Sequence, residues 1–336
     1  MKNIIVTGSA GFIGFSLCVQ LLKLGRNIIG VDNHNDYYDP KIKDARVEIL
    51  KKYPNYKHNK IDLIDKKGLE DIFKVSKSQI VINLAAQAGV RYSMKDPLTY
   101  IRSNILGFSH ILDCCHRFQI EHLVYASTSS VYGANTKMPF SEHDNVNHPL
   151  STYAATKKSN ELMAHAYSHL YKLPTTGLRF FTVYGPWGRP DMALFKFTKA
   201  IIDEKPIEVF NHGKHTRDFT YIDDIIDGII KTIDNPAVGN SNWNSNKPDP
   251  ASSHSPWRIY NIGSNKPVQL LDYIKALEKA IGKKAKINFL PLQPGDVQDT
   301  YANIDIFIEK FNYKPKMSIT QGVSSFVKWY RNYYNI

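Results

Sequence analysis

A glycine-rich turn directly after an apolar run constrains the fold of this chain more than any other feature. Ile4-Ile5-Val6 predicts a buried strand, and the run Thr7-Gly-Ser-Ala-Gly-Phe-Ile-Gly14 turns from that strand into a helix. Gly8 can adopt a backbone conformation closed to other residues, Gly11 lets the main chain approach a phosphate, and Gly14 lets the helix pack closely on the strand. Because the helix N-terminus presents unpaired N–H groups to an anion, the pattern predicts a site for a dinucleotide pyrophosphate.

The next apolar run ends in an acidic residue that bears on the choice of cofactor. Ile28-Ile29-Gly30-Val31 precedes Asp32, which lies 18 residues after Gly14. This is close to the spacing expected of a carboxylate that binds the adenosine ribose hydroxyls. The carboxylate repels a 2′-phosphate, and Asn33 and His34 follow it with no arginine directly after the strand. These residues favour NAD over NADP.

Strand-like runs alternate with helical patterns, which predicts a doubly wound parallel α/β sheet of Rossmann type. The expected strands after the first cover residues 28–32, 60–63, 80–85, 122–127 and 176–184. Ligands bind beyond the carboxyl ends of strands in such sheets. The residues expected to converge there on one crevice are Asp32, Asp62, Ala85, Ala86, Ser127, Thr128 and Tyr184.

The alternation weakens after residue 185, where Pro, Gly and aromatic residues become frequent. We therefore expect an NAD-binding Rossmann domain over residues 1–185, with a returning segment near 220–263. A smaller C-terminal α/β lobe over residues 186–336 should bind the substrate. Residues 239–257 are rich in Asn, Ser and Pro and predict a loop, which the sequence leaves open as ordered or mobile.

The composition argues against several classes of function. Lys and Arg exceed Asp and Glu by 43 to 31, but the basic residues are scattered, so no nucleic acid partner is expected. No run approaches the ~18 apolar residues of a membrane helix and the N-terminus lacks a signal-peptide core, so we expect a cytoplasmic protein with no membrane partner. The three cysteines suit core packing. His165 and His169 have helical i, i+4 spacing without a third ligand nearby, so no metal is expected.

A tyrosine and a lysine form the strongest chemical pattern. Within Ser151-Thr-Tyr-Ala-Ala-Thr-Lys157, Tyr153 and Lys157 lie one helical turn apart on the same face. A phenol is a poor base at neutral pH, but an adjacent ammonium and the positive nicotinamide ring both favour its phenolate. The hydroxyl cluster Ser127-Thr128-Ser129-Ser130 at the end of an expected strand strengthens the case for catalysis.

The chain resembles the extended short-chain dehydrogenase/reductase family over nearly its whole length. The shared motifs are residues 7–14, Asn83-Leu-Ala-Ala86, Ser-Val-Tyr-Gly at 130–133, Tyr153 with Lys157, Arg179-Phe-Phe, Tyr184-Gly-Pro186 and Arg217-Asp-Phe. Within the family it is most similar to nucleotide-sugar 4-epimerases, and closest to the UDP-glucuronate 4-epimerases. The residues that distinguish this group are 32–39, 89–93, 179–192 and 293–297.

The resemblance implies a catalytic triad of Thr128, Tyr153 and Lys157. Tyr153 would be the base, and Lys157 its electrostatic partner and a clamp on the nicotinamide ribose. The implied reaction is NAD-dependent 4-epimerisation of a UDP-sugar, UDP-glucuronate to UDP-galacturonate, through a transient 4-keto sugar. No net redox change results, because the hydride that leaves carbon 4 returns to the opposite face of the sugar.

Pattern and resemblance together assign residues to each ligand. Those assigned to NAD are Gly8, Gly11, Phe12, Ile13, Gly14, Asp32, Asn33, Asn35, Asp62, Leu63, Leu84, Ala85, Ala86, Ala88, Asn104, Ser127, Tyr153, Lys157 and Phe181. Those assigned to the substrate are Arg91, Thr128, Ser129, Ser130, Thr182, Arg189, Val209, Phe210, Arg217, Gln293 and Asp296. The resemblance places Arg189 and Arg217 on the phosphates, the backbone near Val209 and Phe210 on the uracil, and Asp296 on its ribose.

Three hydroxyl residues bear on the choice of sugar. Epimerases of uncharged galactose commonly have Asn where this chain has Thr182. Thr182, Ser129 and Ser130 would make a pocket of neutral donors for a sugar carboxylate. Dehydratases and decarboxylases have an acid where Ser129 and Ser130 stand, and elimination without such an acid lacks its general acid/base. Those activities are therefore less expected here.

Other functions stay open. UDP-N-acetylglucosamine or UDP-glucose 4-epimerisation is the main alternative, because Thr300 is small where galactose epimerases gate bulky 2-substituents. A non-catalytic NAD-binding protein is the least expected, because such proteins usually lose the tyrosine or lysine.

Two positions depart from the family pattern. Asn303 lies near an expected helix start, where Asn caps well. Gln293 stands where galactose epimerases have a second phosphate arginine. The resemblance also implies a homodimer built from the helix before His122 and the helix that carries Tyr153.

Overall fold

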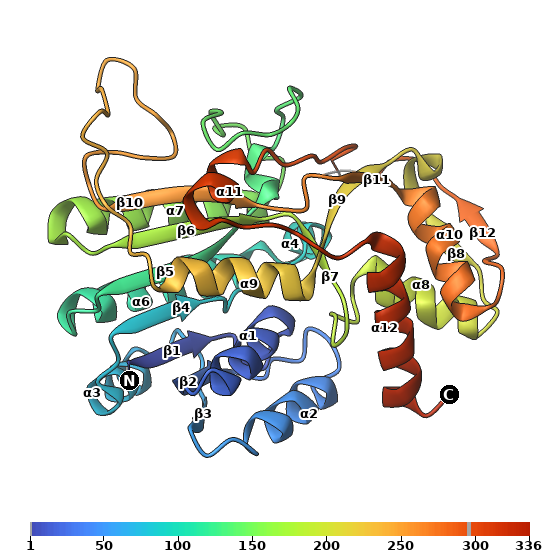
Figure 1. The fold of residues 1–336 in the computed structure, drawn as a ribbon, viewed down its shortest axis with the longest axis horizontal. Coiled ribbons are helices and arrows are strands. Elements are labelled where there is room, and N and C mark those ends of the chain that lie inside the picture. The colour runs from blue at the N-terminus through green and yellow to red at the C-terminus, as the bar shows by residue number, and fades with distance from the viewer. Residues whose placement is uncertain (1, 294–296) are drawn as a thin grey trace.

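The computed structural model describes residues 2–293 and 297–336 and centres on one sheet of seven strands (Figure 1). The strands are β1 (Asn3–Thr7), β2 (Asn27–Asp32), β3 (Tyr56–Lys60), β4 (Ile80–Asn83), β5 (His122–Thr128), β6 (Thr175–Phe180) and β10 (Trp257–Ile262). All neighbours pair in parallel, in the order β10-β6-β5-β4-β1-β2-β3. The predicted doubly wound Rossmann-type sheet is confirmed, and the strand order reverses between β1 and β4, where such sheets bind ligands.

Alternate residues of the central strands face two separate apolar cores. Ile4 and Val6 contribute to one core, whereas Ile5 between them contributes to the other. Strands buried on both faces read as continuous apolar runs. On the first face lie α1 (Phe12–Lys23) and α9 (Ile222–Ile233), and on the second lie α3 (Lys66–Ser76), α6 (Gly107–Arg117) and α7 (Thr152–Tyr171). The sheet is thus a rigid platform that fixes where its strand ends point.

Two predicted strands differ from the structure. The third strand covers Tyr56–Lys60, so the prediction of 60–63 was wrong: this is an edge strand of partly exposed polar residues, which a search for apolar runs overlooks. The strand predicted over 176–184 is two strands. β6 ends at Phe180, and β7 (Thr182–Tyr184) pairs with β9 (Thr216–Tyr221) in a different sheet. The chain therefore leaves the main sheet at Phe181.

The remaining elements gather beside the carboxyl ends of the main sheet, on the right of Figure 1. They include β8 (Ile207–Val209), β11 (Pro267–Gln269), β12 (Ile287–Phe289), α8 (Ala193–Ile202), η3 (Phe210–Gly213), α10 (Leu270–Ile281) and α12 (Ile319–Tyr334). Along the main sheet and its edges lie α2 (Lys41–Leu50), α4 (Val90–Lys95), α5 (Pro97–Tyr100), η1 (Ile101–Leu106), η2 (Ser129–Tyr132) and α11 (Asp305–Phe311). Across the described ranges no helix combines the length and apolarity needed to cross a membrane.

Asn303 and the cysteines behave as the sequence predicts. The side-chain Oδ1 of Asn303 accepts the backbone N–H of Asp305, the first residue of α11, at 2.9 Å. Asn303 therefore lies just before the helix, as expected, although the N-cap of α11 is Ile304 and has no side-chain cap. The three cysteines are free thiols buried in α1 and α6, which confirms their packing role.

Candidate active site

One cavity of about 430 Å³ lies at the carboxyl ends of β1, β2, β4 and β5. Segments that are distant in sequence meet in its wall, as the topology predicts. The residues assigned to NAD that line it are Gly8, Gly11, Phe12, Ile13, Gly14, Asp32, Asn33, Asn35, Asp62, Leu63, Leu84, Ala85, Ala86, Ala88, Ser127, Tyr153, Lys157 and Phe181. The residues assigned to the substrate that line it are Thr128, Ser129, Ser130, Thr182 and Arg189.

The glycine turn has no room for side chains. Gly8 has a φ of +72°, and a Cβ there would lie 2.7 Å from the backbone nitrogen of Ala85. A Cβ on Gly14 would collide with the carbonyl oxygen of Gly8, because α1 begins directly against the turn. The first N–H groups of α1 are therefore open to the cavity, and the turn fits a diphosphate.

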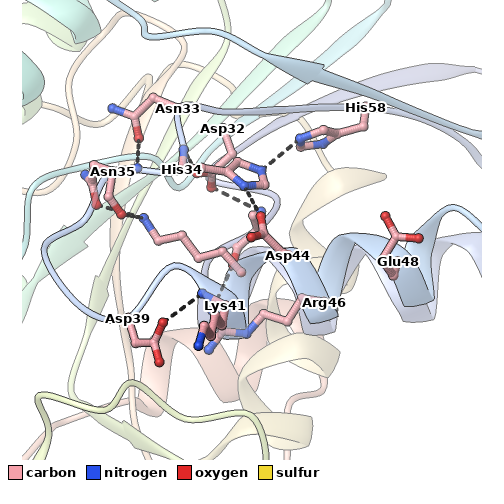
Figure 2. A network of polar contacts seen from close by, with 12 residues as sticks. Asp32, Asn33, His34, Asn35, Asp39, Lys41, Asp44, Arg46, Glu48 and His58 are labelled. Carbon is pink, nitrogen blue, oxygen red and sulfur yellow. Dashed lines mark hydrogen bonds and ion pairs between the residues drawn. The ribbon is translucent and has the colours of Figure 1, made fainter.

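Asp32 is fixed by backbone donors at the end of β2. Its Oδ2 accepts the N–H of Ala10 at 3.1 Å, and its Oδ1 accepts the N–H of His34 at 2.9 Å. Asn33 beside it donates to Asp62 Oδ2 at 2.7 Å. The Oδ1 of Asn33 accepts the N–H of Asn35 at 3.0 Å (Figure 2). Each oxygen of an ionised carboxylate accepts about two hydrogen bonds, so Asp32 keeps capacity for ribose hydroxyls.

Helix α7 positions the tyrosine and the lysine. The Ser151 side chain caps the helix by accepting the N–H of Ala154, which puts Tyr153 in the first turn and Lys157 in the second. Burial raises the pKa of Tyr153, while its hydrogen bond with Thr128 and the charge of Arg189 lower it. The residues proposed as a triad therefore meet at one point of the cavity wall.

Lys157 is a buried cation with no counterion in the described part of the chain. Its side chain is 2% exposed, and Nζ donates to the carbonyl oxygen of Ala126 at 2.9 Å. Burial lowers the pKa of Lys157 from 10.5 to about 8. An ammonium has three donors, so further N–H groups can bind an electron-rich partner in the cavity. This arrangement suits a ribose clamp beside the base.

The depressed pKa of Lys157 predicts a pH effect on stability. Between pH 8 and 10.5 the unfolded chain binds more protons at this residue than the folded one, so the free energy of unfolding rises with pH. Lys157→Met should flatten that rise and stabilise the ligand-free protein at pH 7 by about 2–3 kcal/mol. Urea unfolding of both proteins at pH 7 and pH 10 measures it. A gain no larger at pH 7 than at pH 10 would contradict the prediction.

Arg189 enters the cavity as half of an ion pair. Its Nε donates to Asp191 Oδ1 at 3.0 Å and its Nη2 to Asp191 Oδ2 at 2.5 Å. The Tyr37 hydroxyl donates to the same Asp191 oxygen at 3.2 Å. Nη1 and one N–H of Nη2 stay available in this bidentate geometry, so Arg189 can still bind an anion.

Other residues assigned to the substrate lie outside the described cavity lining. Arg91 stacks over the ring of Phe210, with 4.2 Å between the guanidinium carbon and the ring centroid, and Val209 is buried. Arg217 donates to the carbonyl oxygens of Val297 at 2.5 Å and Gln298 at 2.6 Å. Arg91 belongs to α4, so its contact with Phe210 joins α4 to η3.

Three assigned residues need separate description. Gln293 is partly exposed, and its Nε2 lies 3.5 Å from the carbonyl oxygen of Pro291. Asn104, assigned to NAD, is buried behind the cavity: its side chain accepts the N–H of Gln87 at 2.8 Å and donates to the Gln87 carbonyl at 3.0 Å. It therefore shapes the wall of the cavity through Gln87. Asp296 lies outside the described residues.

Several lining residues were not predicted as site residues. They include Tyr37, Tyr38, Lys43, Gln87, Val90, Ser103, Val183 and Met192. Tyr37 and Tyr38 lie in the stretch 32–39 that marks the family resemblance, so the sequence motif could have predicted that they line the site. Lys43 has the appearance of an ordinary surface lysine in the sequence, and only the packing of α2 against the turn brings it to the cavity.

The histidines, cysteines and acidic residues that the structure describes are the side chains that could form a metal site. In the described ranges, His, Cys, Asp and Glu form no group of three or more that could hold an ion. The histidine pair on α7 contacts serines: His165 Nε2 lies 3.0 Å from Ser253 Oγ, and His169 Nδ1 lies 3.4 Å from Ser255 Oγ. These serines belong to the irregular segment before β10, so both histidines help to hold that segment on α7.

Comparison with known proteins decides the family. The profile of the NAD dependent epimerase/dehydratase family matches residues 4–277. The chain belongs to this family. Among curated relatives of this epimerase/dehydratase are Protein CapI of Staphylococcus aureus, 55% identical over 99% of both chains, and a probable UDP-glucuronate 4-epimerase of Rhizobium meliloti, 44% identical over 98% of this chain and 97% of that one.

A solved structure extends the likeness to three dimensions. This epimerase/dehydratase superposes on UDP-glucuronic acid 4-epimerase from Bacillus cereus, crystallised with UDP-glucuronic acid and NAD, with a TM-score of 0.88. The two are 33% identical, and the match covers 99% of this chain and 100% of that one. The cofactor of the family is NAD, and the glycine turn, Asp32 and Lys157 fit it.

Proposed function

We propose that this protein is an NAD-dependent UDP-glucuronate 4-epimerase that interconverts UDP-glucuronate and UDP-galacturonate. One observation carries the proposal: the cavity joins Tyr153, Lys157 and Thr128 to the neutral hydroxyls of Ser129, Ser130 and Thr182. The first set suits proton transfer beside a nicotinamide, and the second offers a sugar carboxylate donors without a competing acid. The relatives from Rhizobium meliloti and Bacillus cereus, which are named for this activity, support it.

Tyr153 acts as the base and then as the acid. As phenolate it takes the proton of the sugar 4-hydroxyl, and after the keto sugar has turned over it returns that proton to the ketone oxygen. NAD, when bound, accepts the hydride from carbon 4 and gives it back to the other face of the sugar. Burial opposes the phenolate of Tyr153, while the hydrogen bond with Thr128 and the charge of Arg189 favour it. The role given to Lys157 is to add its own positive charge from one helical turn away. The electrons and the proton lost in the first half are restored in the second.

The hydroxyls of the pocket protect the intermediate. A 4-keto uronate is a β-keto acid and tends to lose carbon dioxide. Ser129, Ser130 and Thr182 can hold the carboxylate by hydrogen bonds in a plane unfavourable to that loss. Because none of them is a carboxylic acid, they also leave elimination without a general acid.

The second lobe holds the nucleotide. β7 lines the cavity with Thr182 and Val183 and pairs in register with β9, which carries Arg217. A UDP group that extends along β9 reaches Arg217 and the Arg91–Phe210 pair while Arg189 takes phosphate at the cavity mouth. Residues 1–185 with a return near 220–263 then form the NAD-binding domain, and 186–336 mainly the nucleotide-sugar lobe.

Thr182 offers a test of sugar selection. Thr182→Asn should lower kcat/KM for UDP-glucuronate by about 10- to 100-fold relative to UDP-glucose, because a hydrogen bond to a charged group is lost and a bulkier amide takes its place. Steady-state kinetics with both substrates measures the ratio. Thr182→Ser keeps the hydroxyl and is the matched control. An unchanged ratio in Thr182→Asn would show that Thr182 does not meet the carboxylate.

The protein is also proposed to act as a homodimer. Exposed apolar side chains lie on elements that pack beside one another: Leu98 on α5, Ile101 and Leu106 in η1, and Leu162 on α7. Exposed apolar clusters mark interaction surfaces, so a second copy of this chain can bury the patch in a dimer interface. Light scattering should give a dimer mass for the wild type and a monomer mass for Leu162→Lys. A monomeric wild type at micromolar concentration would contradict the proposal.

The product decides the function. Purified protein is incubated with UDP-glucuronate, and in parallel with UDP-N-acetylglucosamine, and the sugars are resolved by NMR. UDP-galacturonate that approaches equilibrium supports the proposal. Conversion of UDP-N-acetylglucosamine alone would mean that the protein is a 4-epimerase of that sugar and not of UDP-glucuronate. A UDP-pentose as the product of UDP-glucuronate would mean that the protein is a decarboxylase.

A further inference from the structure

Helix α2 carries two buried cations with neutral partners. Lys43 is 4% exposed, and its Nζ donates to the carbonyl oxygen of Asn35 at 2.8 Å and to Asn35 Oδ1 at 2.7 Å (dashed lines at Asn35 in Figure 2). Arg46 is 0% exposed and donates to the carbonyl oxygens of Ala10 at 2.8 Å and Trp187 at 2.5 Å. Within residues 2–293 and 297–336, neither cation forms an ion pair.

Unpaired buried charges are costly and therefore rare. Lysine and arginine are almost never fully buried unless a counter-charge accompanies them, because they lose hydration that neutral acceptors replace only in part. Burial lowers the pKa of Lys43, the negative charges of Asp32 and Asp36 raise it, and the positive charges of Arg46 and Arg189 lower it. Among the described residues the Lys43 ammonium thus has neighbouring carboxylates but no carboxylate in direct contact, and two other cations offset part of their attraction.

Both cations lie against the dinucleotide turn. Lys43 lines the same cavity as Gly8, Gly11 and Gly14. Arg46 holds the carbonyl oxygen of Ala10, which lies between Gly8 and Gly11 in the turn. An ammonium has three donors, and Asn35 uses two of those on Lys43, so one N–H remains for a ligand in the cavity.

We propose that Lys43 binds the diphosphate of NAD and that Arg46 is the positioning residue that holds the turn beneath it. The diphosphate would give Lys43 the directly bonded anion that it does not have among the described residues. The glycine turn offers the diphosphate the dipoles of its N–H groups, and Lys43 offers it a full positive charge. Hydrogen bonds between charged groups are stronger than those between neutral groups. The ribose hydroxyls, by contrast, are assigned to Asp32 at the end of β2. Binding of NAD is a property of the family, so the inference stands apart from the choice of sugar.

The test compares ligands with and without phosphate. Full-length Lys43→Met, freed of nucleotide, is titrated calorimetrically with NAD, ADP-ribose and adenosine. The dissociation constants of NAD and ADP-ribose should rise about 10- to 100-fold, and that of adenosine should stay unchanged. Lys41→Met is the matched control, because Lys41 is an exposed lysine of the same helix, and it should bind all three like the wild type.

Two results with Lys43→Met would overturn the proposal. Unchanged NAD affinity in Lys43→Met would remove Lys43 from the site, and an equal loss for adenosine would mean that Lys43 only shapes the Asn35 loop. A second variant covers a failure to fold. Asn35→Asp supplies the missing carboxylate from within, so it should raise the melting temperature of the ligand-free protein and weaken NAD binding. Undiminished NAD affinity in Asn35→Asp would contradict the proposal as well.

Discussion

Tyr153→Phe should lower kcat about 10²- to 10⁴-fold and leave the affinity for NAD nearly unchanged. The variant keeps the ring and loses the one group that can exchange a proton with the sugar hydroxyl, and general acid–base groups contribute rate factors of this size. Thr128 and Lys157 keep their places, because β5 and the capped start of α7 fix them independently of the phenol oxygen. Initial rates of sugar conversion, with NAD titrated in parallel, measure the effect.

A tyrosine on the same helix provides the control. Tyr167 lies about four turns further along α7 and is half-buried. Within the described residues its hydroxyl makes no hydrogen bond to another residue. Tyr167→Phe should retain the wild-type kcat. If Tyr153→Phe turned over at the wild-type rate, or if both variants lost activity equally, Tyr153 would not be the base.

Arg179→Met should destabilise the protein by about 3–5 kcal/mol, the largest effect on folding that we expect from a single change. Arg179 and Glu161 are fully buried, and the guanidinium donates from Nε to Oε1 at 2.8 Å and from Nη2 to Oε2 at 2.9 Å. Ser127 Oγ donates to the same Oε1 at 2.7 Å. Without the arginine, the Glu161 carboxylate loses its bidentate partner in a buried site.

The double variant Arg179→Met/Glu161→Leu separates the contribution of the ion pair to stability from the contribution of side-chain packing at the same two positions. Without Arg179 the Glu161 carboxylate keeps only Lys158, 3.3 Å from its Oε2, as a cationic partner. Replacing both Arg179 and Glu161 with apolar groups removes this poorly paired buried carboxylate, so much of the lost stability should return. Urea unfolding of the two single variants and the double variant measures the coupling. If Arg179→Met stayed within about 1 kcal/mol of wild type, the size of an ordinary substitution, the buried pair would not make the stabilising contribution given to it here.

The parts of the site that the sequence predicts are the local ones. The glycine turn, Asp32 and the Tyr153–Lys157 pair each lie within one strand-to-helix junction or one helical turn, where spacing alone fixes relative position. The parallel topology then brings such junctions to one edge of the sheet. This is why the sheet class and most of the predicted NAD residues could be found without coordinates.

What the sequence could not predict depends on packing between distant segments. Lys43 is a cavity residue only because α2 lies against the turn at Ala10, and Arg189 faces the cavity already paired with Asp191. Arg217 is engaged by the backbone of residues 297–298, about eighty positions away in the chain. The strand Tyr56–Lys60 escaped prediction because an edge position relaxes the apolar pattern.

The fate of the hydrogen on carbon 4 tests the central claim most directly. UDP-glucuronate deuterated at carbon 4 is converted in ordinary water, and the product is examined by NMR. Because the hydride that leaves carbon 4 is the one that returns to it, the UDP-galacturonate formed should retain the deuterium at that carbon. Product that carries solvent hydrogen at carbon 4 would contradict hydride transfer through NAD and the role given to Tyr153.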